Sequence, residues 1–584
     1  MLKLSKYLKP FWFGLLLIVL LLLGQAMAEL FLPTLMSDIV NDGVVYAYVT
    51  GEPQTGFILR TGGFMLGIAL LAGLASIGAA YISPKIAAAA AKNLRRDLFA
   101  KVEGFSQAEF DKFSSASLIT RCTNDITQVQ QLANVFARLL LYAPIMAIGG
   151  ITMALTRTVS MAWVIALAII VLIFLVVIIV IIVMPKFKLM QELMDKLNKV
   201  SREILHGLMV IRAFGTQNHE KKRFEKSNEE IKDLGLYVGR VMSLVNPLIT
   251  FIMGGTQVLV IWVGAHHVAN SGLPIGDMMA FMQYAMQVII AFMMISMVLI
   301  MVPRAQVSAL RIAEVLNTDF SILDPENPAE FPKTSPQKGE VSFKNISFHY
   351  PGAETNVIEN ISFVAKPGQT TAIIGATGAG KTTIAQLLLR FYDVSEGTIT
   401  VDGLDIRNVK QADLREKIGY VPQKGQLISG TIASNIKYGR ATATQEEIIR
   451  ASEISQAMEF INEKEEKFES EISQGGTNVS GGQRQRISIA RALAKNPEII
   501  VFDDSFSALD FQTDAKLRKA LKENISSATV IVIAQRVGTI INAEQILVVD
   551  EGKIVGRGTH EELLKTCPAY KEIAQSQGVT VNGE

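Results

Sequence analysis

Apolar and polar residues are distributed unequally along this chain. Up to about residue 303 the sequence contains long apolar runs, whereas residues 339–584 alternate between short apolar runs and polar stretches. A helix needs roughly 20 mostly apolar residues to cross a bilayer. We therefore expect six membrane spans, at residues 11–33, 61–83, 130–156, 160–184, 243–268 and 276–302.

These patterns predict an all-α membrane domain of six helices followed by an α/β domain. We place the membrane domain at residues 1–318 and the α/β domain at residues 339–584. Residues 319–338, which are rich in proline and acidic side chains, are expected to form a linker. Pro303 is expected to end the last span, because proline cannot donate a helical hydrogen bond.

Lysine and arginine are concentrated in two of the expected loops, at residues 85–121 and 186–226. The loops on the opposite side carry little beyond Arg60 and Arg157. Because basic loops stay in the cytoplasm, we expect these two loops and both chain termini to be cytosolic. A plasma-membrane location in a bacterium is favoured by this layout and by the absence of organelle-targeting features.

The two basic loops also carry apolar residues at helical spacing, and the second has them at Leu189, Leu193, Leu197, Val200 and Ile204. This spacing predicts that the helices continue beyond the membrane. Stretches near residues 103–113 and 214–224 are candidates for contact with the α/β domain. The alternative for both stretches is a solvated helical surface.

The first expected span has a second interpretation as a signal peptide. Lys3, Lys6 and Lys9 precede an apolar core, and residues 26–28 resemble a signal-peptidase site. We expect an uncleaved membrane anchor.

Polar residues are few within the expected spans. Glu29, Arg138 and Gln257 are expected to face a cavity or another helix, because a bare charge in hydrocarbon is costly. Arg138 could instead extend to the cytosolic boundary. The last span carries methionine every four residues, at Met278, Met282, Met286 and again at Met293, Met297, Met301. Flexible thioether side chains suit a promiscuous binding wall, although packing against lipid or other helices explains them equally. The candidate cavity residues are Glu29, Arg138, Met282, Met286 and Met293.

A glycine-rich loop in the second part has the features of a phosphate-binding loop. An apolar strand at residues 370–375 precedes it, and a helix is expected at residues 382–390. In this context backbone N–H groups surround a phosphate, Lys381 neutralises its charge, and the Thr382 hydroxyl can bind Mg²⁺. The predicted nucleotide-contacting residues of this loop are Gly375, Thr377, Gly378, Ala379, Gly380, Lys381, Thr382 and Thr383.

A second apolar strand, residues 499–503, ends in Asp503, a carboxylate suited to Mg²⁺. Together with the glycine loop it predicts an ATP site. Ser480, Gly481, Gly482 and Gln483 form a further glycine motif between the two. On these motifs, residues 339–584 resemble the nucleotide-binding domain of an ATP-binding cassette (ABC) transporter. With the six spans, the chain resembles one half-transporter of the exporter branch.

The resemblance implies roles for further residues. Tyr350 matches the aromatic residue that stacks on adenine, and Gln423 matches the glutamine that reaches Mg²⁺ and the attacking water. The motif at residues 480–483 matches the signature that contacts ATP held by the opposite subunit. ATP and Mg²⁺ are the implied cofactors, with Thr382, Gln423 and Asp503 as candidate metal-contacting residues.

Two positions depart from the family pattern. Members that hydrolyse ATP usually have glutamate where this chain has Asp504, and histidine where it has Gln535. Aspartate is one methylene shorter, and a misplacement of about 1 Å can slow catalysis ~10²-fold. Glutamine cannot carry the charge of imidazolium. The alternative is that Asp504 and Gln535 compensate for each other.

Because the signature motif is intact, the resemblance implies a heterodimer with one degenerate and one hydrolytic ATP site. The expected partner is a homologous but non-identical half-transporter. The expected function is ATP-driven export of hydrophobic compounds of the multidrug type from the cytosol or inner leaflet. The alternatives are a lipid flippase, a peptide exporter, or an ATP-gated channel or regulatory subunit.

Charge and cysteine content add two limits. The net charge of +2 gives no support for a nucleic-acid partner. Cys122 and Cys567 are the two cysteines, which argues against a disulfide framework or a zinc site. The partners that remain are a second half-transporter, membrane lipid and a hydrophobic small molecule.

Overall fold

The structure is a computed structural model, and it describes residues 6–332, 338–525 and 527–578. Lys3, residues 333–337 of the expected linker and the side chain of Met297 lie outside the described part. The chain forms two compact units. The first comprises Met1–Glu103 with Ala116–Thr318, and the second comprises Gly104–Ser115 with Asp319–Glu584.

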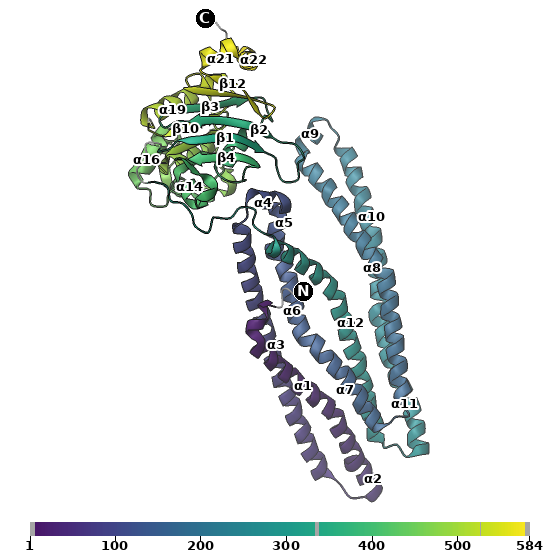
Figure 1. Cartoon of the computed structure of the whole chain (residues 1–584). Coiled ribbons are helices and arrows are strands. Elements are labelled where there is room, and N and C mark those ends of the chain that lie inside the picture. Colours follow the sequence, from purple (N-terminus) through teal and green to yellow (C-terminus); the bar gives the residue numbers. More distant parts are fainter. Residues whose placement is uncertain (1–5, 333–337, 526, 579–584) are drawn as a thin grey trace. The chain divides into compact units, whose positions relative to one another are not determined.

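The first unit is built from helices (Figure 1). A π-helical turn, Ile39–Val45, follows the first long helix, and a second, Arg121–Asp125, follows a short one. The α-helices are α1 (Trp12–Asp38), α2 (Tyr46–Thr50), α3 (Thr55–Glu103), α5 (Ser115–Thr120), α6 (Ile126–Val135), α7 (Leu141–Arg157), α8 (Ala162–His206), α9 (Leu208–Ala213), α10 (Gln217–Ser243), α11 (Val245–Ser271) and α12 (Ile275–Asn317).

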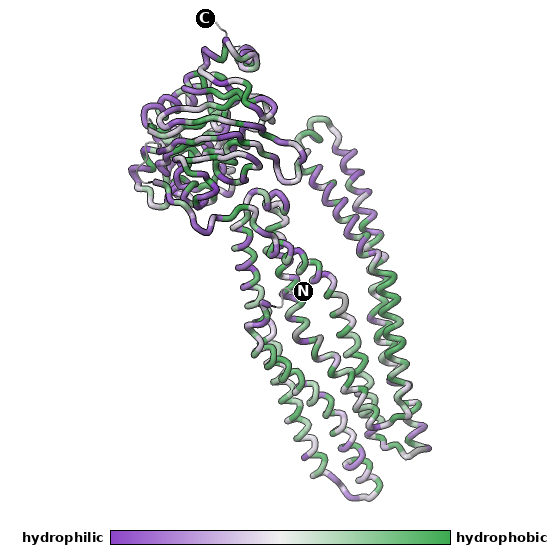
Figure 2. Tube along the Cα trace, in the orientation of Figure 1, coloured by the Kyte–Doolittle hydropathy of each residue, from purple (hydrophilic) through white to green (hydrophobic). Residues whose placement is uncertain are grey.

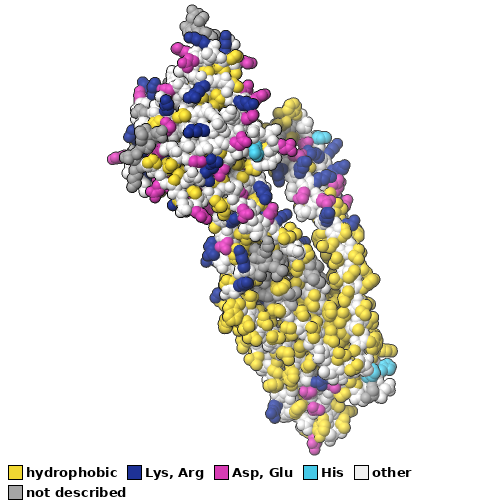
Figure 3. All heavy atoms as spheres, in the orientation of Figure 1, with side chains coloured by type: hydrophobic (Ala, Val, Ile, Leu, Met, Phe, Trp, Pro, Cys, Tyr) yellow, Lys and Arg dark blue, Asp and Glu magenta, His cyan; other side chains and the backbone are white. Residues whose placement is uncertain are grey.

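Five helical segments of the described residues are long and apolar enough to cross a membrane: Lys9–Thr50, Thr55–Glu103, Ala162–His206, Gln217–Asn270 and Ile275–Asn317. They correspond to five of the six expected spans. Hydrophobic side chains dominate the surface of this apolar part on the face shown in Figure 3. The predicted all-helical transmembrane domain is therefore confirmed.

The third expected span, residues 130–156, differs from the prediction of one regular helix. A π-helical turn, Phe136–Leu140, separates α6 from α7, and the apolar α7 has only 17 residues. Arg138 lies in this turn, ahead of the apolar helix. Apolar periodicity does not distinguish an α-turn from a π-turn, which explains the difference.

The prediction that Pro303 ends the last span is wrong, because α12 continues through it to Asn317. Proline removes one helical hydrogen bond. Beyond it, however, Ala305, Ala309 and Ile312 are buried, and their packing offsets the loss. The prediction of helices that extend beyond the apolar runs is confirmed. Figure 2 shows α8 changing along its length from hydrophobic to hydrophilic residues.

The described residues of the second unit form three sheets. An antiparallel sheet has the order β2-β1-β4-β5, with β1 (Val341–Phe348), β2 (Ile358–Ala365), β4 (Glu396–Val401) and β5 (Leu404–Asp405). A six-stranded sheet has the order β12-β11-β3-β10-β9-β6, with β3 (Thr370–Gly375), β6 (Ile418–Val421), β9 (Ile499–Asp503), β10 (Thr529–Ile533), β11 (Gln545–Asp550) and β12 (Lys553–Gly558). The edge strand β12 is antiparallel to β11, whereas β11, β3, β10, β9 and β6 run parallel. The short strands β7 (Gly430–Thr431) and β8 (Glu471–Ile472) form the third sheet.

Helices surround these sheets. They are α4 (Gln107–Phe113), α13 (Lys381–Leu388), α14 (Gln411–Lys417), α15 (Ile432–Lys437), α16 (Gln445–Ile454), α17 (Met458–Asn462), α18 (Gly481–Ala494), α19 (Phe511–Asn524), α20 (Val537–Ile540), α21 (His560–Thr566) and α22 (Pro568–Ser576). Within this unit, the Tyr392 hydroxyl donates to Asp111 of α4 at 2.6 Å. Residues 214–224, the other stretch considered for contact, belong to the first unit.

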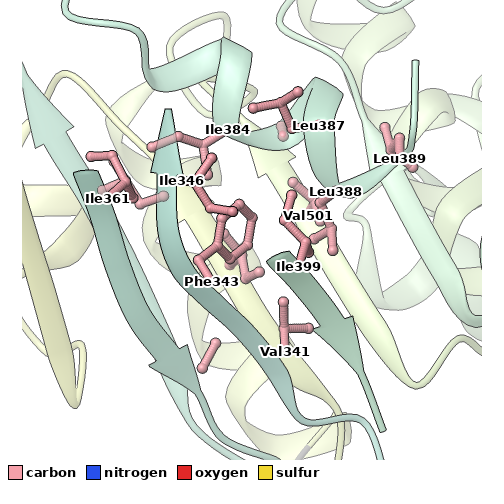
Figure 4. Close-up of a cluster of buried hydrophobic side chains, with 14 of the residues drawn as sticks. Val341, Phe343, Ile346, Ile361, Ile384, Leu387, Leu388, Leu389, Ile399 and Val501 are labelled. Atoms are coloured by element: carbon pink, nitrogen blue, oxygen red, sulfur yellow. The ribbon is translucent and has the colours of Figure 1, made fainter. Parts of the chain in front are cut away.

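The core of the second unit explains why its central strands are continuously apolar. In β9, Ile499 and Val501 belong to one buried cluster, while Ile500 and Phe502 belong to another. Successive side chains point to opposite faces of a strand, so β9 is buried on both faces. In the first cluster, Ile384 and Leu388 of α13 lie near residues of both large sheets (Figure 4).

Candidate nucleotide-binding site

Four neighbouring parallel strands end at one edge of the six-stranded sheet, and a predicted site residue follows each of them. The glycine loop begins at the end of β3, and Gln535 follows β10. Asp504 follows β9, and Gln423 follows β6. Ligands of open α/β sheets bind at the carboxyl ends of the strands, so the fold brings these segments to a typical ligand site.

The glycine loop has the backbone geometry of a phosphate cradle. Gly378 and Gly380 adopt φ of +88° and +90°, in the left-handed region that favours glycine. A Cβ atom on Gly380 would also lie 3.0 Å from the Val357 carbonyl oxygen. The loop leads into the N-terminus of α13, where backbone N–H groups and the helix dipole favour an anion.

Lys381 is buried, and its Nζ donates to the carbonyl oxygens of Gly375 at 2.9 Å and Ala376 at 2.7 Å. Burial lowers the pKa of this ammonium, because the charged form loses hydration. The cation is thus held inside the loop by two neutral acceptors. A phosphate group would supply the negative charge that these carbonyls lack.

Thr382 and Asp503 form an oxygen-rich pair beside the loop. The Thr382 hydroxyl donates to Asp503 Oδ1 at 2.9 Å, and the Tyr420 hydroxyl donates to Asp503 Oδ2 at 3.1 Å. Burial raises the pKa of Asp503. A hydroxyl and a carboxylate are oxygen donors of the kind that Mg²⁺ takes beside a nucleotide phosphate, so the residues fit that metal.

Asp504 lies at the centre of a second polar group. Gln423 Nε2 donates to its Oδ2 at 3.0 Å, and Gln535 Nε2 donates to the same oxygen at 2.9 Å. Its backbone has φ +45° and is fixed by a hydrogen bond from Asp504 N to Ile533 O at 2.9 Å. The side chain is buried, and burial raises the pKa of this carboxyl. The two residues that depart from the family pattern are therefore direct partners.

Tyr350, the predicted adenine contact, is anchored at both ends. Its hydroxyl lies 3.0 Å from Thr383 Oγ1 and donates to Gln386 Oε1 at 3.1 Å. The ring meets Phe348 and Tyr392 edge-on, with centroid distances of 5.1 and 5.2 Å. Thr383, predicted to contact nucleotide, is buried and directs its hydroxyl to Tyr350.

The signature motif forms the start of α18, a helix of 14 residues. Ser480 Oγ accepts from Gln483 N at 3.2 Å, and Gln483 Oε1 accepts from Ser480 N at 3.1 Å. This reciprocal capping box fixes the helix N-terminus. Ser480 and Gly481 are exposed and Gly482 is half-buried, so this end of α18 lies at the surface of the second unit. No hydrogen bond joins this motif to Lys381 or Thr382 among the described residues.

The predicted cavity residues of the first unit have different surroundings. Glu29 is half-buried and accepts hydrogen bonds from Gln25 and Tyr142. Met282 packs against the buried cluster that includes Phe281 and Tyr284, in agreement with the interpretation of this methionine as helix packing. Met286, Met293 and Arg138 are half-buried.

Sequence reasoning missed two residues of the site. Tyr420 donates a hydrogen bond to Asp503. The pairing of β6 with β9 indicates this contact, because it places Tyr420 opposite Val501, two residues before Asp503. Gln386 bonds Tyr350, and it lies three residues after Thr383 on the same helical face.

Comparison with known proteins agrees with this geometry. The family model of the ABC transporter transmembrane region matches residues 15–292, and the ABC transporter model matches residues 358–507. An "Uncharacterized ABC transporter ATP-binding protein" of Mycobacterium tuberculosis is 39% identical over 585 residues, covering 99% of each chain. A "Probable multidrug resistance ABC transporter ATP-binding/permease protein" of Bacillus subtilis is 31% identical and covers 98% of this chain and 97% of its own.

The "ATP-dependent lipid A-core flippase" of Salmonella typhimurium is 30% identical and covers 97% of this chain and 96% of its own. Among solved structures, a bacterial Atm1-family ABC exporter with ATP bound has a TM-score of 0.77 at 24% identity and covers 99% of both chains. That likeness shows the exporter fold. The chain therefore belongs to the ABC transporter family, as a multi-pass membrane protein whose transmembrane and ATP-binding domains share one polypeptide.

Proposed function

We propose that this chain is one subunit of a heterodimeric exporter and that the ATP site around its own glycine loop hydrolyses ATP poorly. The observation that carries the proposal is the pair of amides on Asp504. Both Gln423 and Gln535 donate to its Oδ2, at 3.0 and 2.9 Å. A carboxylate oxygen has two lone pairs, and these two amides occupy both of them on Oδ2. Asp504 is thus short by one methylene, and one of its two oxygens is not free to accept a proton from water.

The same site is well suited to hold ATP. Lys381 supplies a buried positive charge, and Thr382 with Asp503 supplies oxygens for Mg²⁺. Tyr350 presents a ring fixed by α13 for the adenine. Phosphoryl transfer needs positioning as well as charge neutralisation, so loss of a correctly placed base impairs hydrolysis while ATP binding is retained.

The signature motif of this chain serves the other site. The N-terminus of α18, at the exposed Gly481 and the half-buried Gly482, offers backbone N–H groups to the γ-phosphate of ATP held by the partner subunit, and the Ser480 hydroxyl is a further donor. The partner then contributes its own phosphate-binding lysine, catalytic glutamate and histidine. Hydrolysis in the pair takes place mainly at the partner's loop.

Replacement of the partner's catalytic glutamate by glutamine tests this division of labour. We expect ATP hydrolysis by the purified complex to fall to a few per cent or less. The matched control is Asp504→Asn in this chain, for which we expect most of the activity to remain. A stable and fully active homodimer of this chain alone would contradict the proposal.

For cargo, we propose hydrophobic compounds of the multidrug type. The support is the apolar transmembrane domain and the relative named for multidrug resistance. Lipid transport is the second candidate, favoured by the similarity to the lipid A-core flippase. Uptake of fluorescent hydrophobic dyes into inverted membrane vesicles distinguishes the two. ATP-dependent uptake of several chemically unlike dyes supports multidrug export, and flat traces together with flipping of labelled lipid support the flippase.

The orientation is also a proposal. The basic stretches at residues 85–121 and 186–226 are placed in the cytosol, with both termini and the ATP site. The membrane is the plasma membrane of a bacterium. Protease access to a tag at either terminus, measured in inverted and in right-side-out vesicles, tests this arrangement.

A further inference from the structure

Four polar side chains meet within the transmembrane unit, on three helices that are distant in sequence. They are Gln25 and Glu29 of α1, Tyr142 of α7 and Gln287 of α12, and we refer to them as the Glu29 cluster. Gln25 Nε2 donates to Glu29 Oε1 at 2.9 Å, and the Tyr142 hydroxyl donates to Glu29 Oε2. Gln287 Nε2 donates to the Glu29 carbonyl oxygen at 3.2 Å.

The Glu29 cluster has more acceptors than donors. The amide orientation of Gln287 is fixed, because only its NH₂ group can donate to a carbonyl oxygen. Its Oε1 is therefore the free end, and this atom is buried without a hydrogen-bond donor among the described residues. A buried unsatisfied acceptor is unfavourable, so a donor from outside the chain would be stabilised there.

The charge of Glu29 is also uncompensated. Among the residues that the structure describes, no lysine, arginine or histidine forms an ion pair with it, although Arg138 precedes Tyr142 by four residues. By contrast Asp277, the acid at the start of α12, pairs with Arg157 at 2.9 Å. A carboxylate in an apolar helix without a cation typically marks a binding or transport pathway.

The surroundings suit an amphiphilic ligand. Glu29 and Gln25 are half-buried, so the carboxylate remains reachable. Leu30, next to Glu29, belongs to a buried cluster against which Met282 and Phe292 of α12 pack. An apolar body could contact these adaptable side chains while a polar end reaches Glu29.

We propose that the Glu29 cluster binds a protonated amine of the exported compound, through its charge and its N–H donors together. The inference rests on the proposed export of hydrophobic compounds and makes that cargo more specific. A protonated amine can neutralise Glu29 and donate to Gln287 Oε1. A quaternary ammonium offers charge without N–H donors, and an amide offers a donor without charge.

Three dansyl probes with one decyl chain test the proposal. They end in a primary ammonium, a trimethylammonium or an N-acetylamide group. Binding to the full heterodimeric complex in lipid nanodiscs is followed by dansyl fluorescence, with empty nanodiscs subtracted. We expect the ammonium probe to bind about tenfold more tightly than the acetylated probe. The trimethylammonium probe should fall between them.

Two variants locate the effect. Glu29→Gln keeps the shape of the side chain and should remove the preference for both cations. Gln287→Leu should remove only the advantage of the primary ammonium over the trimethylammonium. Gln191→Leu is the matched control, because Gln191 is an exposed glutamine of α8 outside the expected spans and outside the cluster, and it should leave all three affinities unchanged.

Equal binding of the three probes to the native complex would overturn the inference. So would a cation preference that survives in Glu29→Gln while the variant complex retains ATP hydrolysis. Absence of binding by all three probes would overturn it as well. The proposed export function is judged separately, by ATP-dependent uptake of neutral hydrophobic dyes into inverted vesicles, which does not involve the amine.

Discussion

Gln535 donates a hydrogen bond of 2.9 Å to Oδ2 of Asp504. The two residues are 31 positions apart, and the resemblance to hydrolysing ABC transporters predicts histidine and glutamate in their places. Parallel pairing of β9 with β10 brings their strand ends together. The two departures thus form one interacting unit, in which an amide satisfies a shortened carboxylate.

Asp504→Asn should stabilise the nucleotide-free protein at neutral pH. Burial raises the pKa of Asp504 in the folded chain, so folding favours its protonated form. The favourable contribution is present in acid and is lost as the pH rises through the folded-state pKa. The variant should melt a few degrees higher at pH 7.5, since about 1 kcal/mol corresponds to 2–4 °C in a domain of this size. The difference in melting temperature between the variant and the native protein should disappear towards pH 4, as differential scanning calorimetry can show.

Asp510→Asn is the control, because folding shifts the pKa of Asp510 in the opposite direction to that of Asp504. A backbone hydrogen bond from Thr513 lowers the pKa of this exposed helix-capping carboxyl. Its contribution is present above the unfolded-state pKa and is lost in acid. The Asp510 variant should therefore gain no stability at pH 7.5, and equal shifts of both variants at both pH values would contradict the assignment.

Lys417→Met should destabilise the ATP-binding domain. Lys417 Nζ lies 2.9 Å from Asp402, whose side chain is completely buried, and it also pairs with Glu498. Removal of the cation leaves a buried carboxylate uncompensated, which costs about 3–5 kcal/mol. Lys553→Met removes an exposed pair with Glu359 and should cost only about 0–1 kcal/mol. Urea unfolding of both variants measures the difference, and similar losses would show that burial does not set the cost.

Tyr350→Leu should weaken ATP binding at the site of this chain. The ring offers a stacking surface that leucine lacks, and stacking of a base on an aromatic ring contributes about 1–3 kcal/mol. Tyr350→Phe keeps the ring and loses only the hydrogen bonds to Thr383 and Gln386, so its effect should be smaller. Titration with labelled ATP, in a complex whose partner lacks its phosphate-binding lysine, checks both. Equal losses for leucine and phenylalanine would contradict the stacking role.

Much of the fold follows from the sequence, because apolar runs and glycine loops have local causes. The strand expected at residues 370–375 is β3, with the same bounds, and β9 ends at Asp503 as expected. Features that depend on tertiary packing were not predictable. Continuation of α12 past Pro303 relies on residues buried against other helices, and the contact of Gln535 with Asp504 relies on strand order.

Methionine spacing shows the same limit within the membrane domain. A period of four predicts one face of a helix but does not say what covers that face. Met282 packs against a buried cluster of this chain, while Glu29 finds partners on α7 and α12 that no local pattern indicated.

ATP turnover at the site of this chain alone tests the central claim most directly. The complex is prepared with the partner's catalytic glutamate replaced by glutamine, and γ-phosphate release is measured with and without Asp504→Glu and Gln535→His in this chain. We expect very slow release with the native pair and an increase of about ten- to a hundredfold with both substitutions. Rapid release with native Asp504 and Gln535, unchanged by the substitutions, would contradict the account.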